Sequence, residues 1–197
     1  MSLANFTNMK NIVIFSSGEG SNTEKIIEKF SKSKSARVSW IVCNNENAGV
    51  IKIAEKYKKG LQLISKSNLE KNAVQLAEFL KVEKTDLIVL AGFLLKIPNE
   101  IIKAFPDSII NLHPSLLPKF GGKGMYGMNV HRAVVDAREL ESGITIHLVN
   151  EEYDKGKIIF QKKIAVTYTD NAESLSTKIK ELEHIHFPET ILKIVEN

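Results

Sequence analysis

The stretch DLIVLAGF, residues 86–93, decides the fold class of this chain. Residues 87–91 are apolar without a break, so polar and apolar positions do not alternate. A strand of this kind is buried on both faces, which is typical of the centre of a parallel sheet covered by helices. We therefore predict a central parallel strand at 86–93.

Similar apolar runs precede this strand, and segments with helical periodicity separate them. Parallel strands are predicted at NIVIFS (11–16), RVSWIVC (37–43) and LQLI (61–64). Apolar residues recur at helical spacing at Ile26, Ile27 and Phe30, at Val50, Ile53, Ala54 and Tyr57, and at Leu69, Ala73, Leu76, Ala77 and Leu80. Each of these groups predicts one amphipathic helix.

The alternation continues after the central strand. NEIIKAF (99–105) predicts a short helix and SIINLH (108–113) the next strand. Strands that alternate with helices in this way predict an α/β fold with a Rossmann-like, doubly wound, mostly parallel sheet.

The pattern changes beyond residue 120. GGKGMYGMN (121–129) is a glycine-rich loop, and a helix is predicted at 130–137. The segments 143–150 and 157–166 alternate like half-exposed antiparallel strands. A long helix at 172–195 follows, with an expected kink at Pro188. We interpret residues 1–197 as one domain with a C-terminal antiparallel extension.

Composition limits the classes of function. The 197 residues are 43% hydrophobic and 25% charged, as in ordinary globular proteins, and no apolar run reaches the roughly 20 residues of a membrane span. The net charge of +4 comes mostly from lysines scattered along the chain, without the clustered basic and aromatic side chains of a nucleic-acid surface. We expect small anionic ligands, no nucleic acid, no membrane, and a monomer or homodimer.

The N-terminus and the cysteine content bear on localisation. Residues 1–8, MSLANFTN, lack the basic start and apolar core of a secretory signal, and we interpret them as a leader or a short natural extension. The single cysteine, Cys43, excludes an internal disulfide. We expect a cytoplasmic protein in which Cys43 is a small buried apolar residue.

The first candidate site is the loop Gly18-Glu19-Gly20-Ser21-Asn22, between a strand and a helix. Glycines allow a tight turn there, and the amides at the helix start form an anion site. A dinucleotide fingerprint would need a third glycine at position 23, which is Thr, and an acidic residue after the second strand. The loop therefore predicts a single phosphate site, or a loop in which Ser21 or Asn22 only caps the helix.

The second candidate site is the end of the strand SIINLH. Asn111 and His113 are two residues apart in a strand, so their side chains lie on the same face. Pro114 ends the strand and leaves both at the carboxyl edge of the sheet, where open α/β sheets bind ligands. An amide beside an imidazole suits a developing oxyanion. The alternative is a polar strand end whose groups bind only backbone.

The third candidate is Asp154, in the segment NEEYDKGKII (150–159). Asp154 followed by Lys155-Gly156 is typical of a tight turn, and a turn is all that this pattern requires. His147 shares a strand face with Thr145 and Val149, and taken alone we interpret it as a packed histidine.

Several catalytic classes lack support. The sequence has no G-x-S-x-G elbow for a serine nucleophile, and Cys43 has no basic sequence neighbour to activate a thiolate. Cysteines or carboxylates at metal-ligand spacing are absent beside Asn111 and His113. We predict no metal site.

Together these motifs resemble the formyltetrahydrofolate-dependent formyltransferases, most closely the phosphoribosylglycinamide formyltransferases of purine biosynthesis. The resemblance covers nearly the whole chain, from IVIFSSGEGSN (12–22) to ELEHIHFPE (181–189). Its most specific part is NLHPSLLP (111–118) followed by DKGKII (154–159). The GSN loop favours the glycinamide ribonucleotide branch.

The resemblance implies the formyltransferase fold and a reaction. A formyl group would pass from the co-substrate 10-formyltetrahydrofolate to the amine of glycinamide ribonucleotide, without a metal, by direct attack and through a tetrahedral oxyanion. Asn111, protonated His113 and Asp154 would be the catalytic set. Asp154 would favour the imidazolium and relay a proton through water.

The resemblance also implies binding residues. Gly20, Ser21 and Asn22 would hold the substrate phosphate, and Glu183 would lie near the amine. The residues implied for folate binding are Leu94, Leu95, Lys96, Ile97, Asn111 and Tyr153.

Two features depart from the family pattern. Phe120-Gly121-Gly122 and the following KGMYGMN replace a shorter YPG turn, which predicts a larger loop over the site. The arginine that often contacts the folate tail is absent near Leu69, and Lys71 replaces it only partly.

Related activities remain as alternatives. We do not expect a methionyl-tRNA formyltransferase or a formyltetrahydrofolate deformylase, since both usually carry an additional domain. A sugar-nucleotide formyltransferase has a similar core and remains open. A nucleotide-binding module without catalytic activity would leave Asn111, His113 and Asp154 without a shared task.

Overall fold

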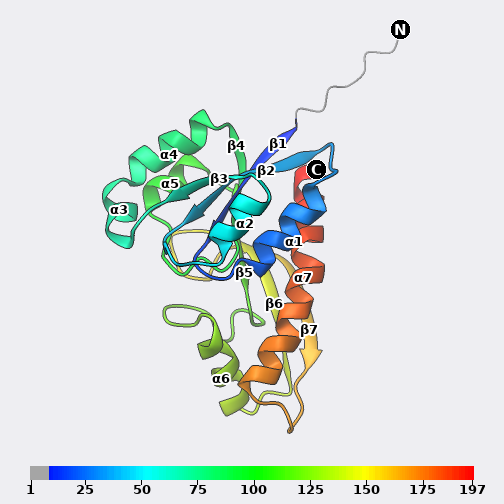
Figure 1. The fold of residues 1–197 in the computed structure, drawn as a ribbon. Helices are drawn as coiled ribbons and strands as arrows, with labels where there is room; N and C mark the ends of the chain where they lie inside the picture. The colour runs from blue at the N-terminus through cyan, green and yellow to red at the C-terminus, as the bar shows by residue number, and fades with distance from the viewer. Residues whose placement is uncertain (1–8) are drawn as a thin grey trace.

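The computed structural model describes residues 9–197 (Figure 1). The interpretation of residues 1–8 as a leader lies outside the described residues. The strands are β1 (Lys10–Ser16), β2 (Ala36–Cys43), β3 (Gly60–Leu63), β4 (Thr85–Leu90), β5 (Ile109–His113), β6 (Glu141–Leu148) and β7 (Ile158–Ala165). The helices are α1 (Ser21–Phe30), α2 (Val50–Lys56), α3 (Lys66–Lys71), α4 (Ala73–Val82), α5 (Asn99–Ala104), α6 (Met128–Asp136) and α7 (Ala172–Glu196).

All these strands form one sheet in the order β3-β2-β1-β4-β5-β6-β7. Every pairing from β3 to β5 is parallel, whereas β6 is antiparallel to β5 and β7 is antiparallel to β6. This topology confirms the predicted Rossmann-like α/β fold with a C-terminal antiparallel extension.

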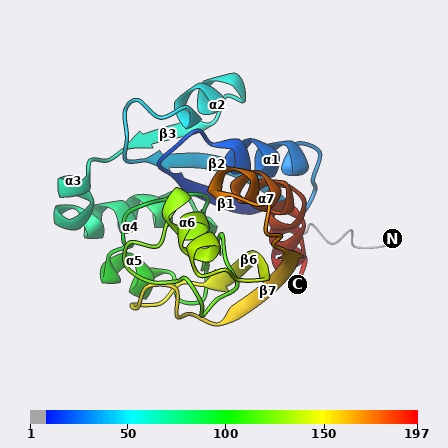
Figure 2. The same cartoon turned by 90° about the horizontal axis from the view of Figure 1, so that it is seen from below.

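Helices cover both faces of the parallel part of the sheet (Figure 2). One apolar cluster packs α1, α2 and α7 on one face, and a second packs α3, α4 and α5 on the other. Strand β1 alternates between the two clusters, with Ile12 and Ile14 in the first and Val13 and Phe15 in the second. Because both faces are buried, β1 is apolar at each of these positions.

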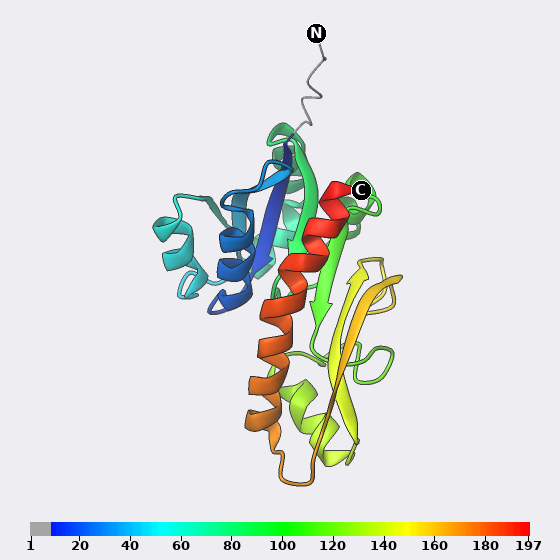
Figure 3. The ribbon, with the colours of Figure 1, turned by 90° about the vertical axis from the view of Figure 1, so that its right-hand side faces the viewer.

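Helix α7 joins the two parts of the molecule. Figure 3 shows it running lengthwise from the region of α6 to the opposite end of the molecule. Its fully buried Leu175 and Phe187 belong to the same cluster as Ile144 of β6 and Ile12 of β1. One helix therefore packs against both the extension and the parallel core.

Two predicted elements end earlier than expected. The helix predicted from Leu69 to Leu80 is two helices, because Asn72 (φ −112°, ψ 26°) leaves the helical conformation between α3 and α4. The strand predicted at 86–93 stops at Leu90, and Gly92 then adopts a left-handed conformation (φ 72°). An apolar pattern alone does not reveal either turn.

The exposure predicted for the extension is wrong. Strand β6 is not half-exposed: its residues 142–147 are all buried. It lies between β5 and β7, with α7 on one side and the segment after β5 on the other, where the Leu117 N–H donates to Thr145 Oγ1 at 3.0 Å. Strand β7 forms the sheet edge and is mostly exposed.

Helix α7 continues through Pro188, where a kink was expected. Proline has no N–H, so one helical hydrogen bond, to the carbonyl of His184, is missing there. In residues 9–197, no helix is both long and apolar enough to cross a membrane.

The strand order determines where a ligand site can form. From β1 the chain moves outward to β2 and β3, and it then returns to β4 on the other side of β1. The loops after β1 and β4 therefore diverge and leave a crevice between them. Open α/β sheets bind ligands in a crevice of this kind, at the carboxyl ends of the strands.

Candidate active site

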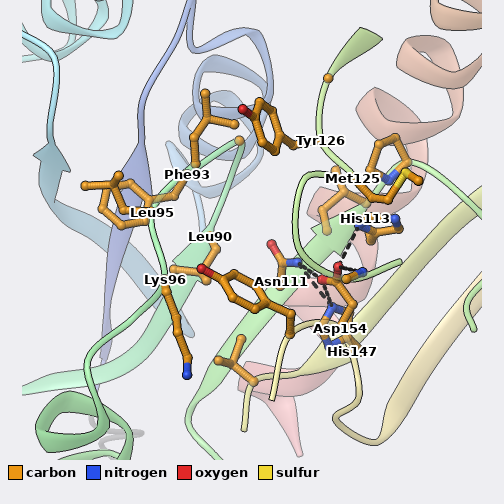
Figure 4. Close-up of a pocket in the computed structure, with 18 of the residues that line it drawn as sticks. Leu90, Phe93, Leu95, Lys96, Asn111, His113, Met125, Tyr126, His147 and Asp154 are labelled. Atoms are coloured by element: carbon orange, nitrogen blue, oxygen red, sulfur yellow. Dashed lines mark hydrogen bonds and ion pairs between the residues drawn. The ribbon is translucent and has the colours of Figure 1, made fainter. Parts of the chain in front are cut away.

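A cavity of about 560 Å³ opens at this crevice (Figure 4). Its walls come from the start of α1, the loop after β4, the end of β5, the glycine-rich loop, the loop before β7, and α7. The predicted site residues that line it are Ser21, Asn22, Leu94, Leu95, Lys96, Ile97, Asn111, His113, Tyr153, Asp154 and Glu183. Gly20 is the one predicted site residue that does not line the cavity.

Gly20 forms the turn before α1. It has φ 78° and ψ 19°, and a Cβ at this position would lie 2.7 Å from Cγ2 of Val50 and 2.8 Å from Cδ1 of Ile53. A side chain would therefore be both strained and overpacked there. Gly20 is itself the N-cap, with no side-chain cap, so the alternative that Ser21 or Asn22 only caps the helix is wrong.

Asn22 connects the loop to α7. Its Nδ2 donates to Oε2 of Glu183 at 2.7 Å, while its buried Oδ1 has no hydrogen-bond partner among residues 9–197. Burial raises the pKa of Glu183 above its ordinary value of 4.5, and the bond from Asn22 opposes this effect. The preceding Glu19 is exposed, so its carboxylate does not obstruct the loop.

Asn111 and His113 lie at the end of β5, as their spacing predicts. In the antiparallel pairing with β6, Asn111 is opposite His147 and His113 is opposite Thr145. His113 is 3% exposed. Its Nε2 lies 2.8 Å from the carbonyl oxygen of Phe120, and since a carbonyl only accepts, Nε2 carries the hydrogen.

Asp154 lies in the turn before β7 with φ 55°, and its carboxylate points toward Asn111, His113 and His147 (Figure 4). Its Oδ2 accepts from Gly122 N–H at 2.8 Å and lies 3.6 Å from Nδ1 of His113. Its Oδ1 lies 3.4 Å from Nδ2 of Asn111 and 3.5 Å from Nε2 of His147. Three distant segments thus meet around one carboxylate.

The electrostatics of this cluster favour an ionised Asp154. Burial raises the pKa of Asp154, but His147, His113 and the Gly122 N–H together lower it below its ordinary value of 3.8. Burial lowers the pKa of His113 below 6.5, and the Asp154 carboxylate opposes burial without cancelling it. Burial thus favours a carboxylate beside a neutral imidazole in the ligand-free pair, and the protonated His113 implied by the resemblance stays a prediction about the reaction.

His147 is a member of the cluster that we did not select from the sequence. It is 2% exposed, and its Nδ1–H donates to the carbonyl of Leu148 at 2.8 Å. Its Nε2 lies 3.1 Å from Nδ2 of Asn111 and in the neutral ring accepts from that amide. The sequence placed His147 on one face of its strand. Only the pairing of β6 with β5 shows that Asn111 is its partner.

The loop after β4 forms the opposite wall. Leu94 is half-exposed at 51% while Ile97 is buried at 3%, and residues 94–97 all line the cavity. Nζ of Lys96 lies 5.6 Å from the ring centroid of Tyr153, in the loop before β7. This cation–π pair spans the cavity between the two loops.

The glycine-rich loop lies over the cluster of Asn111, His113, His147 and Asp154. Gly122, Gly124 and Gly127 all have positive φ, which few other residues adopt without strain. Met125 and Tyr126 line the cavity (Figure 4). The loop thus forms one wall of the cavity, with the large side chains of Met125 and Tyr126.

Another cavity residue missing from the sequence analysis is His131 of α6. It is 4% exposed, its Nδ1 has no hydrogen-bond partner in the described residues, and burial lowers its pKa. Its position in an apolar helix pattern gave no sign that it lines the cavity. In residues 9–197, no three His, Cys, Asp or Glu side chains are grouped so as to hold a metal ion.

Comparison with known proteins identifies the family. Residues 10–191 match the family model described as formyl transferase.

The chain belongs to the formyl transferase family.

Relatives of this family agree with the assignment. The chain is 38% identical over 192 residues to the chloroplastic phosphoribosylglycinamide formyltransferase of Arabidopsis thaliana, covering 95% of the chain and 66% of that protein. It is 35% identical to the phosphoribosylglycinamide formyltransferase of Bacillus subtilis, covering 95% of both. The chain thus spans about two thirds of the plant protein and nearly all of the bacterial one.

Solved structures share the fold. The crystal structure of glycinamide ribonucleotide transformylase 1 from Geobacillus kaustophilus is 30% identical, with a TM-score of 0.87, over 95% of this chain and all of that one. The phosphoribosylglycinamide formyltransferase from Anaplasma phagocytophilum is 31% identical, with a TM-score of 0.86, over 96% of this chain and 88% of that one. The formyltransferase fold expected from the motifs is therefore confirmed.

Proposed function

We propose that this chain is a cytoplasmic enzyme that transfers the formyl group of 10-formyltetrahydrofolate to the amine of glycinamide ribonucleotide. It acts as a monomer or homodimer and needs no metal, nucleic acid or membrane. The observation that carries the proposal is the meeting of Asn111, His113 and Asp154 in one cavity, between the α1 loop and the loop after β4. The names of the family relatives support the same substrates.

Glycinamide ribonucleotide binds at the α1 end of the cavity. Its phosphate accepts hydrogen bonds from the amides of residues 20–22, where the positive end of the helix dipole adds attraction. Glu183, held by Asn22, faces the glycinamide part and its amine. The phosphate is a remote anchor that aligns the amine for attack.

The formyl folate binds at the opposite wall. The pterin ring hydrogen-bonds to backbone groups of residues 94–97, and Tyr153 covers it from the other side of the cavity. Asn111 lies between the two ends, where the formyl carbon of the folate and the amine must meet.

The chemistry is a direct substitution at the formyl carbon. The amine nitrogen attacks this carbon and forms a tetrahedral oxyanion; the bond from carbon to folate N10 then breaks, N10 takes up a proton, and the new amide nitrogen has lost one. The Asn111 amide donates to the oxyanion, replacing its long 3.4 Å contact with Asp154. Such a donor strengthens its bond as negative charge develops on the oxygen.

The proton passes through the Asp154–His113 pair. Because Nε2 of His113 is bound to Phe120, Nδ1 is the nitrogen that gains and loses a proton, and it faces Oδ2 of Asp154. The neutral ring accepts the proton that the amine releases, through water, and Asp154 stabilises the imidazolium until the proton reaches N10. The lowered pKa of His113 and the position of its Nδ1 beside Asp154 support a ring that starts neutral.

A formyl-transfer assay tests the proposal. Incubation of the protein with both substrates should yield formylated glycinamide ribonucleotide and tetrahydrofolate in equal amounts. Formate release without any amine would instead indicate a deformylase, and formylation only of an amino-sugar nucleotide would indicate the related branch. Calorimetry is the companion measurement: glycinamide ribonucleotide and a folate analogue should each bind, and a dinucleotide should not.

A further inference from the structure

Ser17 lies between the two substrate loops. It follows β1 directly and precedes the turn at Gly20, and it is only 6% exposed. Strand β4, whose loop forms the folate wall, is the direct neighbour of β1 in the sheet. Any residue that connects the ends of these two strands therefore connects the two loops.

Backbone bonds carry the β1–β4 ladder up to this residue. The Ala91 N–H donates to the carbonyl of Phe15 at 2.9 Å, and the Ser17 N–H donates to the carbonyl of Gly92 at 3.0 Å. The chain then turns at Gly92, with φ 72°. Beyond this turn the regular parallel pattern of backbone bonds cannot continue.

The Ser17 side chain extends the ladder by one more bond. Its Oγ accepts the N–H of Leu94 at 2.9 Å and donates to Oδ1 of Asn44, which follows β2. The hydroxyl thus uses both its donor and its acceptor capacity. Its own backbone carbonyl accepts a bond from Nδ2 of Asn45 at 3.4 Å. The ends of β1, β2 and β4 are therefore connected through one serine.

We propose that Ser17 is a positioning residue that sets the folate loop relative to the phosphate loop, and so sets the distance between formyl donor and amine. This inference rests on the proposed function. The Leu94 N–H begins the segment 94–97 that would hold the pterin, so its acceptor fixes where that segment starts. Asn44 orients the hydroxyl so that its lone pair faces Leu94.

The variant Ser17→Ala removes the acceptor without touching either ligand site. The part-buried Leu94 N–H then loses its acceptor, and the folate loop shifts to find another partner. We expect the KM for 10-formyltetrahydrofolate to rise by about tenfold, as for the loss of one hydrogen bond that positions the loop. Binding of glycinamide ribonucleotide alone should change much less, since Gly20–Asn22 keep their own contacts.

Matched variants separate positioning from general damage. Ser16→Ala removes the preceding buried serine, which makes neither of these contacts, and should leave both KM values unchanged. Ser17→Thr keeps the hydroxyl and should restore the KM for the folate. Asn44→Ala removes the group that orients the Ser17 hydroxyl but leaves the bond from the Leu94 N–H possible. Its KM for the folate should lie between those of the wild type and Ser17→Ala.

These measurements also distinguish an error in the positioning role of Ser17 from an error in the proposed function. If wild-type protein transfers no formyl group, the proposed function is wrong. If the wild type is active and folded Ser17→Ala keeps a wild-type KM for the folate, only the positioning role is wrong. Hydrogen exchange of the Leu94 amide gives a test that needs no activity. The exchange should be faster in Ser17→Ala than in the wild type or, if Ser17→Ala does not fold, faster in Asn44→Ala. An unchanged exchange rate would overturn the inference.

Discussion

At the scale of single residues, the chemistry depends on the balance between burial and one carboxylate. His113 is buried enough that its pKa falls below 6.5 although Asp154 lies 3.6 Å away. In the proposed mechanism, this balance lets the pair take up a proton and release it again. Burial opposes ionisation of Asp154, but His147, His113 and the Gly122 N–H together lower its pKa and keep it ionised.

Replacing Asp154 tests this balance. In Asp154→Asn the charge that raises the pKa of His113 is lost, so that pKa falls further. The acid side of the kcat/KM profile, where His113 becomes protonated and inactive, should move to lower pH, and kcat should fall by about 100-fold or more. Steady-state kinetics between pH 5 and 8 measure both effects.

A control and an independent titration accompany this variant. Glu151→Gln removes an exposed carboxylate from the same loop and should leave the profile unchanged. The imidazole resonances of His113, followed by NMR, should titrate at lower pH in Asp154→Asn than in the wild type. An equal or higher midpoint would show that Asp154 does not act on His113.

The sequence predicted only part of this cluster. Strand periodicity placed Asn111 and His113 on one face, because two residues in a strand have a fixed relation. Asp154 was recognisable as a turn residue, and its role came from family resemblance. The Gly122 and His147 contacts depend on how loops and strands meet in space, which local patterns do not encode.

At the scale of secondary-structure elements, the turn into α1 is the most constrained backbone of the site. Gly20→Ala forces a side chain into a left-handed conformation and against Val50 of α2. The free energy of unfolding should fall by about 3 kcal/mol, and glycinamide ribonucleotide should bind more weakly. Denaturant titration and calorimetry measure the two effects.

Gly18→Ala is the matched control for this substitution. A Cβ at Gly18 meets no atom within 4 Å, so the free energy of unfolding should change by less than about 0.5 kcal/mol. Equal loss of stability in both variants would mean that the turn at Gly20 is not specially constrained.

Helix α7 offers a second comparison between near neighbours. Phe187 is fully buried in the cluster that joins core and extension, while Ile185 is 60% exposed. Phe187→Ala should lower the free energy of unfolding by about 3–5 kcal/mol, and Ile185→Ala by no more than about 0.5 kcal/mol. Urea titrations of both variants check the difference, and similar losses would contradict the packing of α7.

Element types were predictable where apolar periodicity was strong, and element ends were not. The break at Asn72 leaves the apolar face of α3 and α4 continuous, so the sequence pattern gave one helix. The burial of β6 was missed because its second face is covered by the segment after β5, through Leu117 and Thr145. This packing is a tertiary contact, and the alternation of residue types along β6 does not predict it.

At the scale of the whole molecule, histidine burial should make stability depend on pH. Burial lowers the pKa of His113, His131, His184 and His186 below 6.5. The unfolded chain takes up protons at these groups as the pH falls below 6.5, while the folded chain does so only at lower pH. The free energy of unfolding should therefore decrease from pH 7.5 to 5.5.

Denaturant titrations across this range measure the effect. Glu183 acts in the opposite direction, because burial raises its pKa and lets the folded chain take up a proton at a higher pH than the unfolded chain does. The decrease should be smaller in His131→Asn, which removes one buried imidazole. The same pH dependence in His131→Asn and in the wild type would contradict the burial of this ring.

The overall topology was the most predictable level, because alternating strands and helices leave few arrangements of a parallel sheet. The strand order that separates the loops after β1 and β4 then explains why residues from distant segments reach one cavity.

The central claim is that Asn111, His113 and Asp154 surround the reacting formyl carbon. Its most direct test is the kcat for formyl transfer to glycinamide ribonucleotide in Asn111→Ala, with Asn68→Ala on the exposed side of α3 as the control. We predict a loss of about 100- to 1,000-fold in kcat for a folded Asn111→Ala protein and none for the control. Near wild-type transfer by Asn111→Ala would contradict the account.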